Sequence, residues 1–586
     1  MIDLTRKLSK LYGHFFGFHG EGAKRSAALL GIIGINIALA FLISMINASF
    51  NSFIGVLDLP EITYTAFFGA ALEFMGGVLV YAAIASFNMA LSRWLGDSLA
   101  TEKTLELNRR WNIQNTPFLY KFFEASKKLN PAQIIEQHSR ETAQHSMTLL
   151  NTLLMTTCNA IVGIIGLWRL SSTLTLVIMG APLQIPGYMA LASFLYSLSY
   201  NLIMGYLGRQ LHTHETATRE LQGEVNRQLN HTAVLAEPIA LRKGASFEQE
   251  RTSKILQEQI GQYRTFFIAT ASLGFLRTLH QRLTFAIGLM LSAPEIIAKR
   301  INTAQLFEVS EYFSFVVSLF TWRQDNFEAV TQMTVGAERL EQFETLLSGC
   351  EALAKNKSYQ IEYLNTPNEP ICFSNLAVKT PNGETCIRFP KLEIPQGTRL
   401  KVSGETGMGK TTLLRMLSNI WPYGEGQIRF PAPESDIIRL SQEACFPFRS
   451  TLLEAISYPV NSADVDCQQI QTWMCDLGLE KYSDQLNTSA EWGKVLSGGE
   501  KQRIALLSLL VHRPIIAILD ESFSALDDKT IQVALSLLTK ILPNTTFLCV
   551  DHAPEIHNGF YTHTLHLEKG LEPTLQAVSA ATRLVH

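Results

Sequence analysis

An uncharged apolar run, Ala27–Phe50, is the feature that most limits how this chain can fold. A helix of about 20 apolar residues crosses the hydrocarbon core of a bilayer, so this run is long enough to span a membrane. It follows Lys24 and Arg25, exceeds the length of a signal-peptide core and lacks a clear cleavage site, which indicates a retained span. The chain therefore contains a membrane domain.

Five further candidate spans follow, and charged residues interrupt the last two: 63–91, 146–169, 184–207, 266–291 and 303–322. The loops 51–62 and 170–183 contain no Lys or Arg, whereas 93–145 and 208–265 are long and rich in both. Loops rich in Lys and Arg stay in the cytoplasm. The pattern predicts six spans, with both termini and the two long, helical loops in the cytoplasm. Lys299 and Arg300, in an outer loop, are a mild exception.

The segment before the first span repeats apolar residues at helical intervals beside basic ones: Leu4, Leu8, Leu11, Phe15 and Phe18. This spacing predicts an interfacial helix within 1–26. We expect the transmembrane domain to cover 27–345, a polar linker rich in Pro and Asn to cover 346–369, and a nucleotide-binding domain to cover 370–586. The predicted fold class is an all-α six-helix transmembrane domain followed by an α/β P-loop NTPase domain.

Charge and cysteine content exclude other classes of protein. A net charge of −3 gives no reason to expect nucleic acid as a partner. The eight cysteines are scattered without C-x-x-C or metal-ligand spacing, which fits a reducing compartment better than a disulfide framework.

A phosphate-binding loop is predicted in "RLKVSGETGMGKTTLLRML", where a strand, a glycine turn and a helix follow one another. Backbone N–H groups of the turn would surround the β-phosphate, Lys410 would reach the β/γ oxygens, and Thr411 would offer its hydroxyl to Mg²⁺. The residues assigned to ATP are Gly404, Glu405, Thr406, Gly407, Met408, Gly409, Lys410, Thr411 and Thr412.

Two carboxylates end the buried strand predicted in "RPIIAILDES". Asp520 at the strand tip is predicted to hold Mg²⁺, and Glu521 to orient or deprotonate the attacking water. A second turn, in "LSGGEKQR" (496–503), would present the backbone N–H groups of Ser497, Gly498 and Gly499 at a helix start, which suits an anion. One chain thus carries two candidate phosphate turns.

Together with "SALD" (524–527) and "VDHAP" (550–554), these motifs resemble the ATP-binding cassette (ABC) family in order and spacing. The resemblance implies that Gln442 contacts Mg²⁺ and the water, and that His552 contacts the γ-phosphate. It also implies that Ser497, Gly498 and Gly499 bind the nucleotide of a partner cassette, so a homodimer is expected. Thr380 stands where the family usually has an adenine-stacking aromatic residue, so no adenine contact is assigned.

The membrane half is similar to the SbmA/BacA-like bacterial transporters and the peroxisomal fatty-acyl half-transporters in "LNPAQIIEQ" (129–137), "IPGYMALASFLYSLSYNLIMGYLGRQL" (185–211) and "EPIALRKGASFEQE" (237–250). After the phosphate-loop helix, "WPYGEGQI" (421–428) also fits this group. Ala132, Ile134 and Pro238 depart from the pattern of this group. The bacterial members imply uptake of peptide- or cobalamin-like solutes across the inner membrane, and the peroxisomal members imply movement of fatty-acyl groups.

Three carboxylates at predicted membrane depth, Glu73, Glu308 and Glu311, indicate a wet cavity, because a charge there costs about 2.5–3.5 kcal/mol. A packing role for Glu73 stays open. Such a cavity suits polar or cationic cargo better than acyl chains. The sequence predicts an ATP-driven transporter of a hydrophilic or amphipathic solute, with uptake favoured by resemblance. The alternatives are an exporter or flippase of lipid or fatty-acyl cargo, and a membrane-anchored sensory ATPase.

Overall fold

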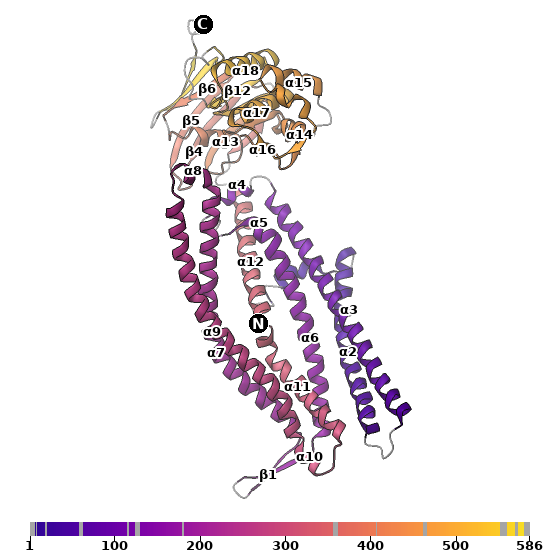
Figure 1. Ribbon diagram of the computed structural model, residues 1–586. Coiled ribbons are helices and arrows are strands. Elements are labelled where there is room, and N and C mark those ends of the chain that lie inside the picture. The colour runs from indigo at the N-terminus through magenta and orange to yellow at the C-terminus, as the bar shows by residue number, and fades with distance from the viewer. Residues whose placement is uncertain are drawn as a thin grey trace. The chain divides into compact units, whose positions relative to one another are not determined.

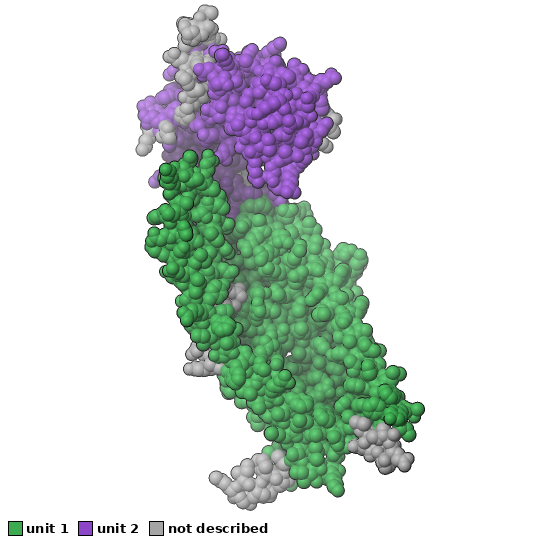
Figure 2. Space-filling view, in the orientation of Figure 1, with its two compact units in different colours: residues 1–111, 125–346 green, residues 112–124, 347–586 purple. Residues whose placement is uncertain are grey.

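The computed structural model describes residues 6, 9–17, 20–57, 63–113, 116–123, 129–178, 181–355, 361–367, 369–405, 407–460, 466–550, 559–568 and 572–578. The chain divides into two compact units, which Figure 2 colours separately. The first unit comprises 1–111 and 125–346, and the second comprises 112–124 and 347–586.

Long helices build the first unit (Figure 1), and the last of them ends in the second unit: α2 (Gly20–Leu57), α3 (Tyr64–Trp111), α6 (Ser139–Leu170), α7 (Tyr188–Val234), α9 (Ala245–Leu291), α11 (Thr303–Asp325) and α12 (Phe327–Lys355). Shorter elements connect them: η1 (Gly13–Phe15), α5 (Pro131–Gln133), η3 (Ile134–His138), β1 (Leu174–Ile178), β2 (Ala181–Ile185), α8 (Ala236–Leu241) and α10 (Ala293–Ile297). β1 and β2 form an antiparallel hairpin.

Four predicted spans lie entirely within long helices, 63–91 begins one residue before α3, and 184–207 begins in β2 before α7, so the all-α class predicted for this half is confirmed. Among the described residues, three stretches are long and apolar enough to cross a membrane: Gly20–Val56, Tyr64–Trp111 and Pro131–Leu170. α9 and α11 contain two of the other predicted spans, and α7 contains residues 188–207 of the third.

Local capping explains where two of these elements begin. Asn130 accepts a hydrogen bond from the Ala132 N–H at 3.1 Å, and Pro131 follows it at the first position of α5. Asn302 and Gln305 form a reciprocal capping box at the start of α11. These polar residues satisfy N–H groups that a helix start leaves without partners.

Asparagines hold three helices of the first unit together. Asn36 of α2 and Asn88 of α3 both donate to Oδ1 of Asn151 on α6, at 2.8 and 2.9 Å. Asn36 and Asn88 are buried. Polar bonds between helices in an apolar environment fix which faces meet, because the alternative is an unpaired amide.

A buried ion cluster ties α3 to α12. Lys103 is only 1% exposed and pairs with Glu106 at 2.9 Å and with Glu344 of α12. The Phe15 ring lies 5.8 Å from Lys103 Nζ. A buried charge is tolerated only when it is paired, so the two carboxylates and this covering ring belong to one cluster.

The N-terminal segment therefore differs from the interfacial helix predicted over 1–26. Leu11 and Tyr12 are buried at 2% and 3% exposure, and the Tyr12 hydroxyl donates to the Ser139 carbonyl at 3.4 Å. α2 already begins at Gly20, inside the predicted range. Phe15 covers the Lys103 cluster, whereas Leu4, Leu8 and Phe18 lie outside the described residues.

Arg300 is one of the two basic residues that the sequence places in an outer loop, and it lies beside an acidic side chain. Its Nη1 lies 3.3 Å from Oε2 of Glu295, which is almost fully buried. The Ser172 N–H, from the other outer loop, donates to Glu295 Oε1 at 3.0 Å. The cation is therefore partly neutralised.

Two sheets organise the second unit. One has the order β14-β13-β6-β12-β11-β8, parallel except for the edge strand β14, and the other has the order β3-β7-β4-β5. Their strands are β3 (Glu362–Asn365), β4 (Ile371–Lys379), β5 (Thr385–Ile394), β6 (Arg399–Gly404), β7 (Gly424–Phe430), β8 (Ile437–Leu440), β11 (Ile516–Asp520), β12 (Thr546–Val550), β13 (His563–Leu567) and β14 (Thr574–Ala577). β3 lies inside the region predicted as a linker.

The remaining elements of the second unit surround these sheets: α4 (Thr116–Tyr120), α13 (Lys410–Leu417), η5 (Glu434–Asp436), β9 (Ser450–Thr451), α14 (Leu452–Ser457), α15 (Cys467–Asp476), η7 (Glu480–Gln485), β10 (Ser489–Ala490), α16 (Trp492–Val495), α17 (Gly498–His512) and α18 (Asp528–Ile541). One apolar core lies around α17, and a second joins α13 to both sheets. The α/β class predicted for this half is confirmed.

Part of the first long loop belongs to the second unit. The Phe122 ring packs edge-on against Trp421 at 5.4 Å, and Trp421 Nε1 donates to the Lys379 carbonyl at 2.8 Å. The two long loops were predicted to be helical, and α3 continues past its predicted span, 63–91, to Trp111. Beyond α3, the partly buried Phe118 and Phe122 pack against the second apolar core of the second unit.

Candidate functional site

The predicted phosphate loop joins β6 to α13 in the second unit. β6 lies between β13 and β12 and ends at Gly404, and α13 begins at Lys410. Gly404 has a φ of +150°, and a Cβ there would lie 2.5 Å from the Leu567 carbonyl oxygen. Gly407 has a φ of +88°, and the space where its Cβ would stand is open. The glycines therefore permit a close turn with free space beside its backbone.

Lys410 is held against this turn. Its side chain is buried, and Nζ donates to the carbonyl oxygens of Gly404 at 2.5 Å and Glu405 at 3.4 Å. A lysine anchored at the start of the following helix matches the chemistry that a nucleotide β/γ-phosphate requires. Thr406, which was predicted to contact ATP, lies outside the described residues.

The carboxylates lie where the sequence predicted, at the end of β11. Asp520 is the last residue of the strand, and Gln442 Nε2 donates to Glu521 Oε2 at 2.9 Å. Glu521 has a φ of +47°, which is strained for a residue with a long side chain. Such strain is often found at functional positions, where it orients a side chain. His552 lies outside the described residues.

Gln502, which the sequence analysis did not single out, braces the turn that carries Glu521. Its amide donates to the Glu521 carbonyl at 3.3 Å and to Ser524 Oγ at 3.1 Å, and it accepts from the Ala525 N–H at 2.8 Å. Gln502 is buried on α17. A polar residue at a buried helical position was the available signal.

Gln502→Ala is expected to lower ATP turnover by roughly tenfold to a hundredfold while ATP affinity changes little, because a small misplacement of a reacting group costs that much. Steady-state kinetics would separate the fall in kcat from any rise in KM. Gln502→Glu is the companion variant, since it keeps the acceptor for the Ala525 N–H but loses the two donated bonds. A loss of ATP affinity equal to the loss of kcat would contradict this positioning role.

The second predicted phosphate turn begins α17. Ser497 is the N-cap residue and forms a capping box with Glu500, whose carboxylate accepts from the Ser497 N–H at 2.8 Å. This bond corrects one expectation: the Ser497 N–H is not bare, which leaves those of Gly498 and Gly499 at the helix start. Lys481 lies 2.5 Å from the Glu500 carboxylate, and its hydrogen bond, with that of the Ser497 N–H, lowers the pKa of Glu500 to about 2.

The two predicted phosphate turns, 404–412 and 497–499, belong to different parts of the second unit. Among the described residues, no hydrogen bond joins 404–412 to Ser497, Gly498 or Gly499. A composite site made from two chains remains compatible with this arrangement.

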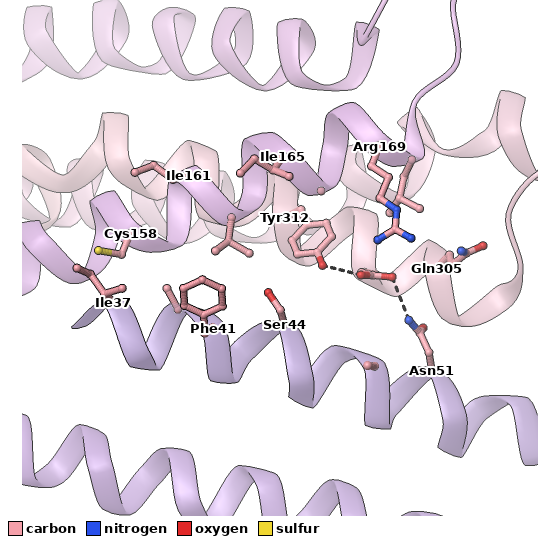
Figure 3. A pocket seen from close by; sticks show the side chains of 16 residues that line it. Ile37, Phe41, Ser44, Asn51, Cys158, Ile161, Ile165, Arg169, Gln305 and Tyr312 are labelled. Atoms are coloured by element: carbon pink, nitrogen blue, oxygen red, sulfur yellow. Dashed lines mark hydrogen bonds between the residues drawn. The ribbon is translucent and has the colours of Figure 1, made fainter. Parts of the chain in front are cut away.

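A cavity of about 580 Å³ lies within the first unit, between α2, α6 and α11. Figure 3 shows apolar side chains, among them Ile37, Phe41 and Ile161, toward one end and Arg169, Gln305 and Asn51 toward the other. The remaining lining residues are Ala40, Ser44, Ala48, Cys158, Val162, Ile165, Gly166, Leu170, Glu308 and Tyr312.

Glu308 organises the polar end of the cavity. Asn51 Nδ2 donates to Glu308 Oε2 at 3.1 Å, and the Tyr312 hydroxyl donates to Glu308 Oε1 at 2.6 Å (Figure 3). Gly166 leaves room for the Tyr312 ring, because a Cβ at that position would lie 2.3 Å from a ring carbon. The packing of α6 on α11 therefore sets where this hydroxyl points.

The other two carboxylates predicted at a cargo cavity lie elsewhere on the helices. Glu73 is exposed on α3 and accepts a long hydrogen bond, 3.5 Å, from Ser49. Glu311 is half-buried on α11 beside Asn47. Neither residue lines the 580 Å³ cavity, so their contact with cargo stays a prediction.

Two protein families match successive parts of the chain. The ABC transporter transmembrane region 2 matches residues 22–297, and the ABC transporter domain matches residues 388–524. The chain is a fused ABC half-transporter. The half-transporter hydrolyses ATP to drive transport, as its cassette domain and its relatives indicate.

Relatives of the half-transporter include bacterial and animal proteins. An uncharacterised ABC transporter ATP-binding protein of Haemophilus influenzae is 26% identical over 72% of this chain and 69% of its own length. The inner membrane ABC transporter ATP-binding protein YddA of Escherichia coli is 24% identical, over 77% and 78% of the two chains. Human ATP-binding cassette sub-family D member 3 is 30% identical over 33% of this chain and 30% of its own.

The fold of the half-transporter is also found in a solved structure. A bacterial Atm1-family ABC exporter with ATP bound superimposes with a TM-score of 0.72 at 16% identity, covering 94% of this chain and 96% of the exporter. At this identity the similarity concerns the fold.

Proposed function

We propose that a homodimer of this half-transporter exports an amphipathic solute, using the free energy of ATP hydrolysis. The observation that carries the proposal is the cavity of α2, α6 and α11, whose lining is apolar at one end and charged at the other. A solute with an apolar body and a polar head matches both ends. A purely hydrophilic solute would leave the apolar wall unmatched.

Two similarities support an outward direction. The chain shares its fold with an Atm1-family exporter over 94% of its length, and about a third of it is similar to sub-family D proteins of animals. The sequence resemblance to bacterial uptake systems favoured the opposite direction. We give the fold more weight because the similarity covers both units.

Residues at the carboxyl end of β11 and in the segments that follow β6 and β8 fit an ATP-bound Mg²⁺. Thr411, Asp520 and Gln442 offer a hydroxyl, a carboxylate and an amide oxygen, which are ligands that Mg²⁺ prefers. When bound, Mg²⁺ neutralises charge on the phosphate oxygens. Lys410 would add a second positive charge to the same phosphates.

Glu521 is proposed to orient and deprotonate the attacking water. Gln442 donates to its carboxylate, and Gln502 braces the backbone beneath it. These contacts hold one carboxylate in a strained but defined position, which proton abstraction at a single water requires. His552 is proposed to contact the γ-phosphate, on the family resemblance alone.

The remaining parts of the proposal concern assembly and location. The turn of Ser497, Gly498 and Gly499 would bind the nucleotide on the partner's phosphate loop, which makes a homodimer necessary. We place the protein in the bacterial inner membrane as a multi-pass protein, with its cassette domain and both termini in the cytoplasm.

Inside-out membrane vesicles provide the test of direction. The probes are tritiated ten-carbon amphiphiles with three heads: decylamine, decanoate and 2-aminodecanoate. We expect ATP-dependent accumulation of at least one probe in vesicles that expose the cassettes, and no such accumulation with Glu521→Gln. Accumulation only in right-side-out, energised vesicles would establish uptake. Hydrolysis without movement of any probe would favour the sensory ATPase.

A further inference from the structure

We infer that the cavity of α2, α6 and α11 binds an amphiphile whose head carries both a positive and a negative charge. The inference rests on the proposed function and names the chemical class of its solute. Arg169 would receive the anionic group of the head, and Glu308 would receive the cationic group.

Arg169 is a cation of the cavity lining that forms no ion pair among the described residues. It lies in the last turn of α6, its side chain is exposed, and among the described residues it has no hydrogen-bond or ion-pair partner. Figure 3 shows it at the same end as Asn51 and Gln305. A guanidinium offers five N–H donors in a planar fork that suits a carboxylate or phosphate.

Glu308 differs from Arg169 because hydrogen bonds from neighbouring side chains already orient its carboxylate. Asn51 and Tyr312 each donate to one of its oxygens, and each carboxylate oxygen can accept a second hydrogen bond. The carboxylate is thus oriented, and its oxygens can still accept further hydrogen bonds. An ammonium group on the ligand would donate these bonds.

The two charges line one cavity without pairing with each other, since no ion pair within 4.0 Å joins them among the described residues. A ligand with only one charge would pair with one of these side chains and leave the other partly desolvated and unpaired, which is costly. A zwitterionic head pairs with both. The cavity therefore selects for the presence of two opposite charges.

The apolar end of the cavity indicates that the rest of the ligand is an apolar chain. Ile37, Phe41, Ile161 and Ile165 are all exposed there, by 48%, 72%, 54% and 63%. Covering such surface is favourable in proportion to the apolar area removed from water. A cavity of about 580 Å³ has the size of sites that hold drug-sized molecules, which fits a chain of roughly ten carbons.

Binding of the same three ten-carbon probes tests the inference directly. Calorimetric titration into the full protein in nanodiscs, with empty nanodiscs subtracted, would give each Kd. Because charge-assisted hydrogen bonds are the strong ones, we expect 2-aminodecanoate to bind roughly tenfold to a hundredfold more tightly than decanoate or decylamine. Equal Kd values for the three probes would overturn the inference.

Two variants test which side chain binds the anionic group of the ligand head and which binds the cationic group. Arg169→Gln is expected to reduce 2-aminodecanoate to the affinity of decylamine, and Glu308→Gln is expected to reduce it to that of decanoate. Arg169→Lys keeps the positive charge and should retain most of the preference. Glu328→Gln is the matched control, because it removes an exposed carboxylate from α12, in the same unit but outside the cavity. Loss of the preference in Glu328→Gln and not in Glu308→Gln would contradict the assignment.

A membrane lipid could supply the same head chemistry as a free solute. Nanodiscs of phosphatidylethanolamine and of phosphatidylglycerol separate these sources. Probe binding that is weaker only in phosphatidylethanolamine nanodiscs would identify the zwitterionic lipid as the occupant, whereas equal binding in both kinds of nanodisc would identify a free solute.

If 2-aminodecanoate shows no preference but another probe is exported, the inference fails and the proposed export stands. If 2-aminodecanoate binds as expected but no probe is exported, the export fails and the binding site stands.

Discussion

Glu521→Gln is expected to bind ATP normally and to hydrolyse it roughly 100-fold to 10,000-fold more slowly, the range attributed to general acid–base catalysis. The amide has the size of the carboxylate and can still contact Gln442, so the site should keep its shape. It cannot accept the proton of the attacking water. Steady-state phosphate release and equilibrium ATP binding, measured on the same preparation, check the two halves of this expectation.

Two comparisons make the Glu521 result specific. Glu480→Gln removes a carboxylate from η7, where Glu480 is exposed, and should leave hydrolysis unchanged. Gln442→Ala removes the donor to the Glu521 carboxylate and should lower turnover less than Glu521→Gln. Near-normal hydrolysis by Glu521→Gln would show that another group is the base.

Much of the fold could be predicted because its signals are local. Apolar runs long enough to span a bilayer fall within long helices, and the strand, glycine turn and helix around Gly404 and Lys410 follow one another as expected. The pairing of Gln442 with Glu521 joins residues 79 positions apart. Nothing local to either residue predicts this contact, and the family resemblance implied only that Gln442 contacts Mg²⁺ and the water.

Contacts that depend on tertiary packing could not be predicted. Phe122 lies in a loop between membrane helices, yet it is packed against Trp421. Leu11 has the helical spacing of an interfacial segment, yet it is buried. Gln502 required knowledge of which face of α17 meets the turn after Glu521. In each case the sequence does not show which surface the side chain covers.

In the membrane half, the surroundings of the three carboxylates also could not be predicted from the sequence. Hydropathy places Glu73, Glu308 and Glu311 at membrane depth, but the rotation of each helix decides what they face. For Glu308 that rotation depends on the close approach of α6 and α11 at Gly166 and Tyr312. The decisive signal was therefore a small residue on another helix.

Mixed dimers are expected to recover ATP occlusion that neither parent shows. One chain carries Lys410→Ala, which weakens its phosphate loop, and the other carries Ser497→Arg, which blocks its second turn. If the two turns act across the dimer, both defects fall in one composite site, and the other site combines an intact Lys410 with an intact Ser497. If each site used the two turns of its own chain, every site would keep one defect.

The design needs controls for folding and for stoichiometry. Ser497 caps α17, so Ser497→Arg must be shown to fold by its thermal unfolding profile before mixing. Two different affinity tags, purified in sequence, isolate dimers that contain one chain of each kind. A dimer of one unmodified and one Lys410→Ala chain gives the signal expected from a single intact site.

The central claim is that each ATP site is formed by two copies of this chain. Nucleotide occlusion by the co-purified mixed dimers tests this claim most directly. Trapped ATP would be counted per dimer after gel filtration. We expect the mixed dimer to occlude about one nucleotide, as the single-site control does, and each parent homodimer to occlude almost none. Mixed dimers that occlude no more nucleotide than either parent would contradict the claim.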